Sequence, residues 1–337
     1  MFNKQLYNLP YHEVDLSKYS FLITGGAGFI GSNLVEYLLK YNAGHVRVLD
    51  NLSNGYFENI KDFKGFKNFE FIEGDIRDFG VCKQAVEGIN YISHQAALGS
   101  VPRSIADPIT SNNVNISGFV NMLTAAKESN TLKSFVYAAS SSTYGDSPSL
   151  PKIEGNEGKP LSPYAVTKLV NELYADIFSK TYGLHSTGLR YFNVFGPKQS
   201  PTNAYAAVIP KFITSALRQT SPTIFGDGET SRDFTFIENV VQANIKALLN
   251  FTEIQNHEVL NIAFGDRTSL NKLWSLIVKY LNCESLIPNY KDERVGDVKH
   301  SLANISKAKK FINYSPLFDV EKGLKITIEY LKTQNYV

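Results

Sequence analysis

The sequence predicts an α/β protein with a doubly wound parallel Rossmann sheet and a smaller mixed α/β domain that would hold the substrate. Short apolar strands alternate with amphipathic runs over the first 140 residues, a glycine-rich turn follows the first strand, and the chain after residue 197 becomes rich in Pro, Gly and Tyr. This alternation is typical of parallel sheets covered by helices. We expect the sheet domain at 1–196, completed by about 236–263, and the smaller domain at 197–235 and 264–337.

Length and composition agree with two domains of ordinary globular type. The 337 residues exceed what one hydrophobic core usually organises, and 20% are charged and 43% hydrophobic. A net charge of +2 gives no reason to expect nucleic acid or a membrane, so we expect small-molecule partners. Cys82 and Cys283 have no paired spacing, which indicates neither a disulfide framework nor a metal site. With no run of membrane-spanning length, we expect a cytoplasmic protein.

The first strand, expected at 21–24, leads into the turn G-G-A-G-F-I-G at 25–31 and a helical run at 33–41. Early glycines permit a tight turn and close approach of a pyrophosphate, and the helix N-terminus would face the phosphates. A second strand at 46–49 ends at Asp50, whose carboxylate can accept from adenosine ribose hydroxyls and would repel a 2′-phosphate. The pattern therefore favours NAD over NADP.

A third strand at 69–72 leads to Asp75, which can contact the adenine amino group. A fourth strand at 91–94 is followed by small residues that suit a backbone lying against a cofactor, namely Ala96, Ala97 and Gly99. His94 has no metal-spaced partner, so we interpret it as a core histidine at a strand end.

After a helical run at 115–127, a fifth strand at 134–139 ends in the hydroxyl cluster S-S-S-T-Y at 140–144. Open α/β sheets hold their ligands at the carboxyl ends of the strands. Hydroxyls there can hydrogen-bond a substrate alcohol and shuttle its proton. A simple turn is the alternative, and no acid–histidine partner supports a nucleophile.

A helix is expected to begin after Ser162, a suitable N-cap, with Pro163 in its first position. Tyr164 and Lys168 are four residues apart and therefore share one helix face. A free tyrosine, with a pKa near 10, is a poor base at neutral pH, but a nearby cation can lower that pKa. Such pairs are common on solvated helices, so the cofactor context is what favours a catalytic base here.

The remaining chain is expected to complete the sheet and form the smaller domain. A sixth strand at 187–192 ends at Asn193, and a hairpin-like turn is expected at 226–228. Further helices are expected at 211–217, 239–249, 269–281 and 318–332, with a strand at 259–263. Arg232 and Arg294 lie beside glycine-rich chain and can bind a diphosphate, although surface ion pairs are the alternative.

These motifs resemble the extended short-chain dehydrogenase/reductases and, over essentially the whole chain, their nucleotide-sugar 4-epimerases. The resemblance is carried by T-G-G-A-G-F-I-G at 24–31, the serine cluster, Tyr164-x-x-x-Lys168 and R-Y-F-N at 190–193. The chain is most similar to bacterial UDP-N-acetylglucosamine 4-epimerases of surface-polysaccharide synthesis, including O-antigen. This similarity is carried by H-Q-A-A-L-G-S-V-P-R-S at 94–104, A-S-S-S-T-Y-G at 139–145 and G-E-T-S-R-D-F at 228–234.

The resemblance implies an isomerase with tightly held NAD. Tyr164, as phenolate, would take the proton of the sugar 4-hydroxyl through Ser140 while C4 passes hydride to NAD, and Lys168 would hold the nicotinamide ribose and lower the tyrosine pKa. The 4-keto sugar would then rotate and take the hydride back on its other face. Relatives usually pair as dimers through two helices each, so a homodimer is expected.

The resemblance also implies two sets of contacts and no metal. The cofactor set is Gly25, Gly28, Phe29, Ile30, Asp50, Asn51, Asp75, Ile76, Ala96, Ala97, Tyr164, Lys168 and Tyr191. The UDP-sugar set is Gly99, Ser100, Ser140, Ser141, Ser142, Tyr164, Asn193, Gln199, Ala207, Val208, Arg232, Arg294, Asp297 and Ser301.

Substrate choice is expected to depend on Gly99 and Ser301, because epimerases for plain UDP-glucose carry bulkier residues at the matching positions. Small residues make room for a 2-N-acetyl group, which Ser141, Ser142 and Gln199 can hydrogen-bond. We therefore expect interconversion of UDP-GlcNAc and UDP-GalNAc, with weaker action on UDP-glucose and UDP-galactose.

Three other functions are alternatives to a UDP-N-acetylhexosamine 4-epimerase. A UDP-N-acetylhexosaminuronic acid 4-epimerase would keep the fold and chemistry, and Arg103 can pair with a carboxylate. A 4,6-dehydratase would need an Asp-Glu pair where Ser141 and Ser142 stand. A binding protein without catalysis would lack the tyrosine or the lysine, and both are present.

Overall fold

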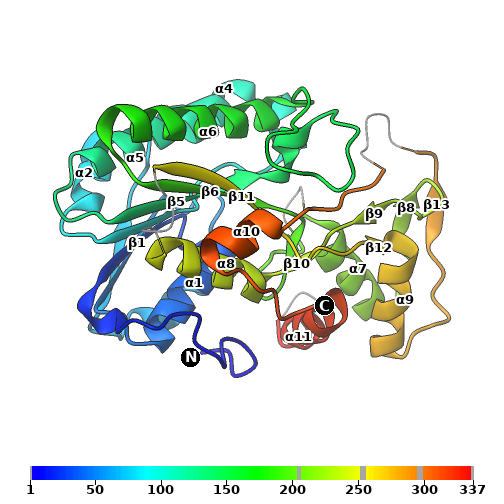
Figure 1. Cartoon of the computed structure of the whole chain (residues 1–337). Coiled ribbons are helices and arrows are strands. Elements are labelled where there is room, and N and C mark those ends of the chain that lie inside the picture. Colours follow the sequence, from blue (N-terminus) through cyan, green and yellow to red (C-terminus); the bar gives the residue numbers. More distant parts are fainter. Residues whose placement is uncertain (1, 203–205, 251–255, 294–298, 335–337) are drawn as a thin grey trace.

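The computed structural model describes residues 2–202, 206–250, 256–293 and 299–334. A seven-stranded sheet with the order β11-β6-β5-β4-β1-β2-β3 forms its centre, and all neighbouring strands are parallel. This confirms the predicted fold class (Figure 1). The strands are β1 (Ser20–Thr24), β2 (His45–Asp50), β3 (Phe69–Glu73), β4 (Tyr91–His94), β5 (Ser134–Ser140), β6 (Ser186–Tyr191) and β11 (His257–Ile262).

The strand order creates a crevice at one edge of the sheet. The chain runs outward from β1 through β2 to β3 and then returns to place β4 on the other side of β1. At such a switch point the connections leave β1 and β4 in opposite directions, which opens a space beyond their carboxyl ends. The turns after these strands carry the glycine motif and the small residues after His94.

Helices cover both faces of the sheet, which explains why the central strands are almost entirely buried. Figure 1 shows α1 and α8 on one face and α2, α5 and α6 on the other. Their bounds are α1 (Phe29–Lys40), α2 (Phe79–Val86), α5 (Gly118–Lys127), α6 (Pro163–Tyr182) and α8 (Ile237–Leu249). Ser162 caps α6 by accepting from the Ala165 N–H at 3.2 Å, so the predicted helix start is confirmed.

The helical run predicted at 115–127 begins earlier than expected. It is preceded by α3 (Val101–Ala106), α4 (Pro108–Asn112) and a π-helical turn (Asn113–Ser117). Pro102 and Pro108 lie in the first turns of these two helices, where no N–H bond is lost, and Ser100 and Asp107 cap the helices.

The rest of the chain forms a second region beside the sheet. It contains α7 (Val208–Leu217), α9 (Leu270–Leu281) and α11 (Val320–Lys332), whereas α10 (Ser306–Ile312) packs on α8 and β11 of the sheet domain. Three small sheets pair β7 (Val194–Phe195) with β10 (Thr235–Phe236), β9 (Ser231–Arg232) with β12 (Thr268–Ser269), and β8 (Thr223–Phe225) with β13 (Asn289–Lys291). Short 3₁₀ turns lie at Leu16–Lys18, Phe57–Asn59, Lys61–Phe63 and Ser141–Tyr144.

The hairpin expected at 226–228 is wrong. The chain does turn there, but β8 pairs with β13 and β9 pairs with β12, so the flanking strands are not partners. Gly228 has a φ of +79°, a conformation that favours glycine, and a Cβ on it would lie 2.0 Å from the side chain of Asn271 in α9. The turn at this glycine therefore lies against a helix and does not join two paired strands.

Residues before β1 pack on the sheet domain. Tyr7 and Tyr11 are buried, and the carboxylate of Glu238 in α8 accepts from the Tyr7 N–H at 2.9 Å and the Tyr11 hydroxyl at 2.6 Å. Cys82 and Cys283 are both free and buried. Within the described ranges, no helix combines the length and the apolar composition needed to cross a membrane.

Candidate active site

Two adjoining cavities lie at the carboxyl edge of the large sheet. The crevice cavity, of about 590 Å³, extends from the glycine turn to α6. The α7 cavity, of about 640 Å³, lies between α7 and the small strands β8 and β9. The two share Asn193, Val194, Ala206 and Ala207 in their walls. An elongated ligand can therefore extend from one into the other.

The glycine turn forms a flat wall of the crevice cavity. Gly25 has a φ of +67°, and a Cβ on it would lie 2.7 Å from the Ala96 nitrogen. Gly28 is the N-cap of α1 and makes no side-chain capping bond. The N–H groups of the first turn of α1 are thus left for an anion that approaches the backbone closely.

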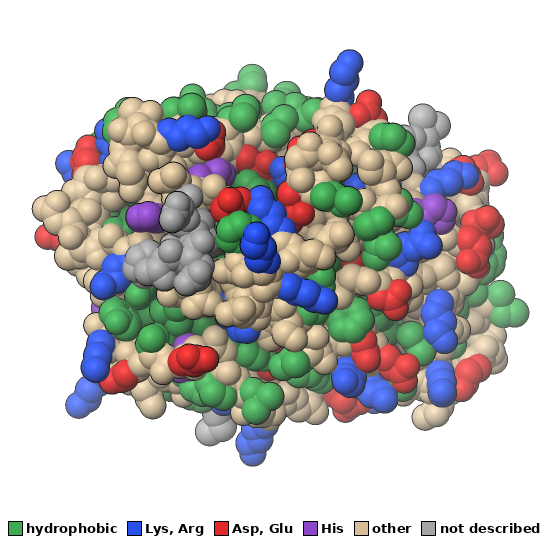
Figure 2. Space-filling model, viewed as in Figure 1, with side chains coloured by type: hydrophobic (Ala, Val, Ile, Leu, Met, Phe, Trp, Pro, Cys, Tyr) green, Lys and Arg blue, Asp and Glu red, His purple; other side chains and the backbone are tan. Residues whose placement is uncertain are grey.

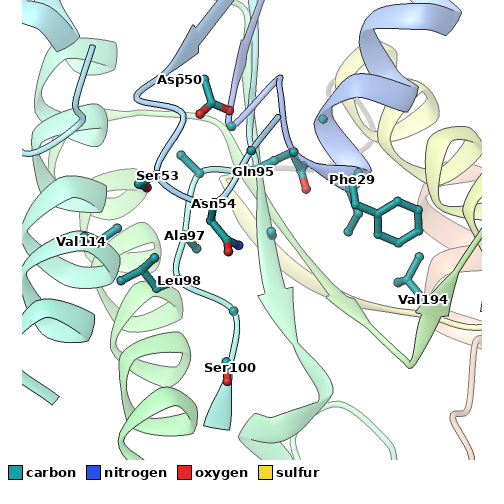
Figure 3. Close-up of a pocket in the computed structure, with 18 of the residues that line it drawn as sticks. Phe29, Asp50, Ser53, Asn54, Gln95, Ala97, Leu98, Ser100, Val114 and Val194 are labelled. Carbon is teal, nitrogen blue, oxygen red and sulfur yellow. The ribbon is translucent and has the colours of Figure 1, made fainter. Parts of the chain in front are cut away.

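Two carboxylates lie at the ends of β2 and β3. Asp50 is buried and accepts from the N–H groups of Ala27 at 2.9 Å and Leu52 at 2.8 Å. Burial raises its pKa, while these backbone bonds oppose that rise. Bonds from Arg77 hold the pKa of Asp75 at about 2, and Asn51 donates to Asp75 at 2.8 Å. Figure 3 shows Asp50 above Ser53 and Asn54, across the cavity from Phe29 and Val194.

Tyr164 and Lys168 both line the crevice cavity, together with Ser140. Burial raises the pKa of Tyr164, and a hydrogen bond with Ser140 lowers it. The Ser140 and Ser142 hydroxyls are 2.8 Å apart. The lowering of the Tyr164 pKa in the structure comes from Ser140, and the lowering expected from Lys168 stays a prediction. Burial lowers the pKa of Lys168 itself to about 8.

His94 lies in the core, in agreement with its interpretation as a structural residue. Its Nδ1 is 2.8 Å from the Thr24 hydroxyl, and its ring packs against Phe119 and Phe135. Burial lowers its pKa to about 3, so the imidazole is neutral at physiological pH.

Polar residues also line the crevice cavity, among them Gln95, Tyr191 and Gln199. Tyr191 hydrogen-bonds Gln95 and Asn244, both at 3.2 Å. The Nε2 of Gln199 donates to the Val194 carbonyl at 3.0 Å. Its Oε1 is buried and accepts no hydrogen bond from any described residue.

The α7 cavity combines aromatic walls with one guanidinium. Phe212, Phe225 and Phe234 line it, and Arg232 enters from β9. One nitrogen of Arg232 donates to the carbonyls of Ser231 at 3.1 Å and Lys299 at 3.2 Å. These bonds orient the guanidinium at the cavity wall.

Most of the predicted site residues lie together. All thirteen predicted cofactor contacts line the crevice cavity, as do Gly99, Ser100, Ser140, Ser141, Asn193, Gln199 and Ala207. Val208 and Arg232 line the α7 cavity. Ser142 and Ser301 line neither cavity; Ser142 bonds Ser140, and the Ser301 N–H donates to the Ser231 carbonyl at 3.1 Å. Arg294 and Asp297 lie outside the described residues.

Other lining residues were not predicted. The loop after β2 contributes Ser53, Asn54, Gly55, Tyr56 and Asn59 to the crevice cavity. The Asn54-Gly55 pair is a turn signal directly after Asp50 and indicates that the chain folds back there. By contrast, Phe212 and Phe225 carry no signal of their own, because isolated aromatic residues are usually part of a core.

Comparison with known proteins assigns the chain to a family. The model of the NAD dependent epimerase/dehydratase family matches residues 21–263. The chain belongs to this family. Its cofactor is therefore NAD, as predicted, and the crevice cavity fits it: the uncapped α1 terminus suits a pyrophosphate, and Asp50 and Asp75 lie at the ends of adjacent strands.

Individual relatives of this epimerase/dehydratase match over nearly their full length. A putative UDP-glucose 4-epimerase of Methanocaldococcus jannaschii is 35% identical over 93% of this chain and 99% of its own. The UDP-N-acetylglucosamine 4-epimerase of Methanobrevibacter ruminantium M1, solved with UDP-N-acetylmuramic acid, is 39% identical with a TM-score of 0.87, over 94% and 98% of the two chains. The UDP-glucuronic acid 4-epimerase of Bacillus cereus, solved with UDP-glucuronic acid and NAD, is 32% identical with a TM-score of 0.85, over 93% and 99%.

Proposed function

We propose that this enzyme is an NAD-dependent nucleotide-sugar 4-epimerase, and that its substrate is a UDP-N-acetylhexosamine, with UDP-GlcNAc and UDP-GalNAc interconverted. The observation that carries the proposal is that a cavity with a buried phenol, hydroxyl and ammonium adjoins one with an oriented guanidinium and aromatic walls. The first suits proton transfer at a sugar alcohol, and the second suits a nucleoside diphosphate.

Cofactor binding is assigned to the walls of the crevice cavity. Residues at 25–30 would hold the pyrophosphate, while Asp50, Asn51, Asp75 and Ile76 would hold the adenosine half. Ala96 and Ala97 present small side chains, and Tyr164, Lys168 and Tyr191 would surround the nicotinamide half. Bound NAD supplies a hydride acceptor, and later a hydride donor, for C4 of the sugar.

Proton transfer is assigned to Tyr164. Its phenol hydrogen-bonds Ser140 at the end of β5, so a sugar 4-hydroxyl beside Ser140 can pass its proton to the phenolate. The ammonium of Lys168 on the same helix stabilises that phenolate electrostatically when the site is closed. The sugar passes through a 4-keto form. This form must turn its opposite face toward the hydride donor, so that C4 takes back the hydride, and its oxygen the proton, with inverted configuration.

The diphosphate and uridine are assigned to the α7 cavity, held by Arg232, Asn193 and the backbone at Ala207 and Val208. The helix N-terminus of α7 begins at Val208, so its free N–H groups face this region. Arg294 and Asp297 are proposed as further contacts of the diphosphate and uridine, and the family resemblance is the only basis for them.

The N-acetyl group is assigned to the wall formed by Gly99, Ser141 and Gln199. A Cβ on Gly99 would meet open space, so this glycine leaves room that a larger side chain would fill. The buried, unpartnered Oε1 of Gln199 can accept from the acetamido N–H. Ser142 would position Ser140 through the hydrogen bond between their hydroxyls. Ser301, which bonds the neighbour of Arg232, would contribute by being small.

The rival uronic acid substrate would need a cation beside its carboxylate. Arg103, the candidate for pairing with its carboxylate, donates from Nη2 to Asn54 Oδ1 at 3.1 Å. Asn54 belongs to the loop after β2, on the side proposed for the cofactor. The N-acetylhexosamine therefore remains the preferred substrate, although a relative acts by name on UDP-glucuronic acid.

A homodimer is proposed through α4 and α6. Ile109 is 73% exposed, and on α6 Val166, Leu173 and Ile177 are 46%, 58% and 54% exposed. Figure 2 shows hydrophobic side chains gathered over the edge where Figure 1 places α4 and α6. An apolar stripe on two adjacent helices is typical of a surface that a second subunit covers.

The test is ¹H NMR of purified protein with UDP-GlcNAc and no added cofactor. Anomeric signals of UDP-GalNAc should grow to equilibrium, because NAD is retained. UDP-glucose should convert more slowly and UDP-N-acetylglucosaminuronic acid more slowly still. Conversion of the uronic acid alone would replace the proposed substrate by its rival. No conversion of any of the three, from protein that releases NAD on denaturation, would refute the function.

A further inference from the structure

Lys168 is a buried ammonium that needs a counter-charge. Only 3% of its surface is exposed, and its Nζ donates to the Ala138 carbonyl at 2.8 Å. A carbonyl dipole compensates a buried charge only in part, so an ammonium in such a place tends to lose its proton unless a carboxylate lies near. The structure therefore raises the question of which carboxylate keeps this lysine charged.

Glu172 is the candidate. It follows Lys168 by one helical turn on α6, on the same face, and is 6% exposed. Its two carboxylate oxygens accept from Arg190 Nε at 2.8 Å and Nη2 at 2.6 Å. Since both oxygens are held by Arg190, Glu172 acts on Lys168 through space and not through a direct bond.

Arg190 is shared between two carboxylates. It lies on β6, is 3% exposed, and donates from Nη1 to Glu157 as well as to Glu172. Lys168 and Arg190 carry two positive charges, and Glu157 and Glu172 carry two negative charges. The group of four is thus electrically neutral only when Lys168 is protonated.

Two further carboxylates lie near this cluster, because Asp176 on α6 acts electrostatically on Tyr137 and Glu154 acts on Tyr144. The uncharged titratable groups on the surrounding elements are His94 on β4, whose pKa is lowered to about 3, Tyr137 on β5, Tyr144, whose ring lies 4.8 Å from the Arg190 guanidinium, and Tyr164 on α6. Burial raises the pKa of all three tyrosines. Among the described residues, Glu172 is the carboxylate that acts electrostatically on Lys168.

We propose that Glu172, held in place by Arg190, is a positioning residue for the reaction that keeps Lys168 in its charged form inside the active site. The inference rests on the proposed function, because it assigns Lys168 its role beside Tyr164 and the nicotinamide ribose. Glu172 touches neither cavity wall and acts entirely through Lys168. Without Glu172, the ammonium would be lost at a lower pH, and with it the support for the phenolate.

The experiment compares Glu172→Gln with wild type in the pH profile of kcat. The alkaline limb of wild type should fall near the pKa of Lys168, about 8. An opposite charge at this range moves a pKa by about one unit or more, so the limb of Glu172→Gln should lie about one unit lower. Titration of the ¹³Cε lysine signals, with Lys168 assigned from Lys168→Arg, should show the same shift without any turnover.

Glu157→Gln is the matched control, because Glu157 is also a partner of Arg190 but, unlike Glu172, does not lie one turn from Lys168 on α6. The alkaline limb of the Glu157→Gln profile should lie at the wild-type pH. Glu172→Asp keeps the negative charge, so its limb should lie closer to that of wild type than to that of Glu172→Gln. If Glu172→Gln does not fold, Glu172→Met, which removes the charge and keeps the length of the side chain, replaces it and should lower the alkaline limb by the same amount.

An unchanged limb and lysine titration in the Glu172 variant would overturn the inference, as would equal shifts in Glu157→Gln. Both outcomes presuppose that the wild-type protein catalyses epimerisation. A wild type that does not epimerise would instead refute the proposed function, so the two failures are distinct.

Discussion

The ammonium of Lys168 donates a hydrogen bond of 2.8 Å to the carbonyl oxygen of Ala138. Ala138 lies on β5, two residues before Ser140, so this bond ties the helix of the proposed base to the strand of the hydroxyl cluster. The phenol of Tyr164 and the hydroxyl of Ser140 are thereby held in fixed relation. Such fixed geometry removes an entropic cost from proton transfer.

Tyr164→Phe should reduce kcat by at least about a hundredfold, because removal of a general base costs this much or more. The protein should still release NAD on denaturation, since Phe keeps the packing of the ring. Tyr182→Phe on the same helix, where the side chain is 53% exposed, is the control and should leave kcat unchanged. Near-normal turnover of Tyr164→Phe in the NMR assay would remove the phenol from the mechanism.

Ser301→Tyr should suppress turnover of UDP-GlcNAc while sparing UDP-glucose, because the family resemblance associates a large ring at this position with epimerases for plain UDP-glucose. Ser301 is half-buried and its N–H bonds Ser231, the neighbour of Arg232. The same substitution at exposed Ser306 controls for the bulk of a tyrosine. Equal loss of kcat/KM on both substrates would show that Ser301 does not filter substrates by size.

The strands of the sheet could be predicted because each is a short apolar run followed by a turn or a functional residue. Asp50, His94 and Ser140 all lie in the last position of their strands. The start of α6 was equally clear, since Ser162 caps it with its own side chain. Local chemistry determined these features, so the sequence alone was enough.

Other features depend on distant contacts and could not be predicted. The turn at Gly228 suggested a hairpin, but α9 approaches it, and the neighbouring strands pair with residues 36 to 66 positions away in the sequence. The pKa of Tyr164 was expected to fall under the influence of Lys168, yet burial raises it. Burial depends on the whole fold, whereas the four-residue spacing gave only the shared helix face.

Leu173→Glu combined with Ile177→Glu should convert the protein from a dimer to a monomer, because carboxylates on an apolar interface cannot be desolvated cheaply. Mass measurement by light scattering after size-exclusion chromatography checks this. Ile287→Glu places the same charge at a side chain that is 71% exposed outside α4 and α6, and should leave the mass unchanged. A wild type that elutes as a monomer would contradict the proposed interface directly.

Acid should destabilise the protein partly through His94. Its pKa in the folded state is about 3, below the ordinary value of 6.5, because burial disfavours the imidazolium. The unfolded chain therefore binds the proton first, so the stabilising contribution is complete above pH 6.5 and is lost as pH falls from 6.5 toward 3. His257, with a pKa of about 4, acts in the same direction.

Within this window, each unit of pH should remove up to about 1.4 kcal/mol of unfolding free energy per buried histidine. Urea unfolding at pH 7 and pH 5 measures the loss. His94→Gln should lose less free energy between the two pH values than wild type, even if it is less stable at pH 7. His185→Gln, at an exposed position, should keep the wild-type difference. The same pH dependence in His94→Gln and wild type would mean that His94 is not buried as a neutral ring.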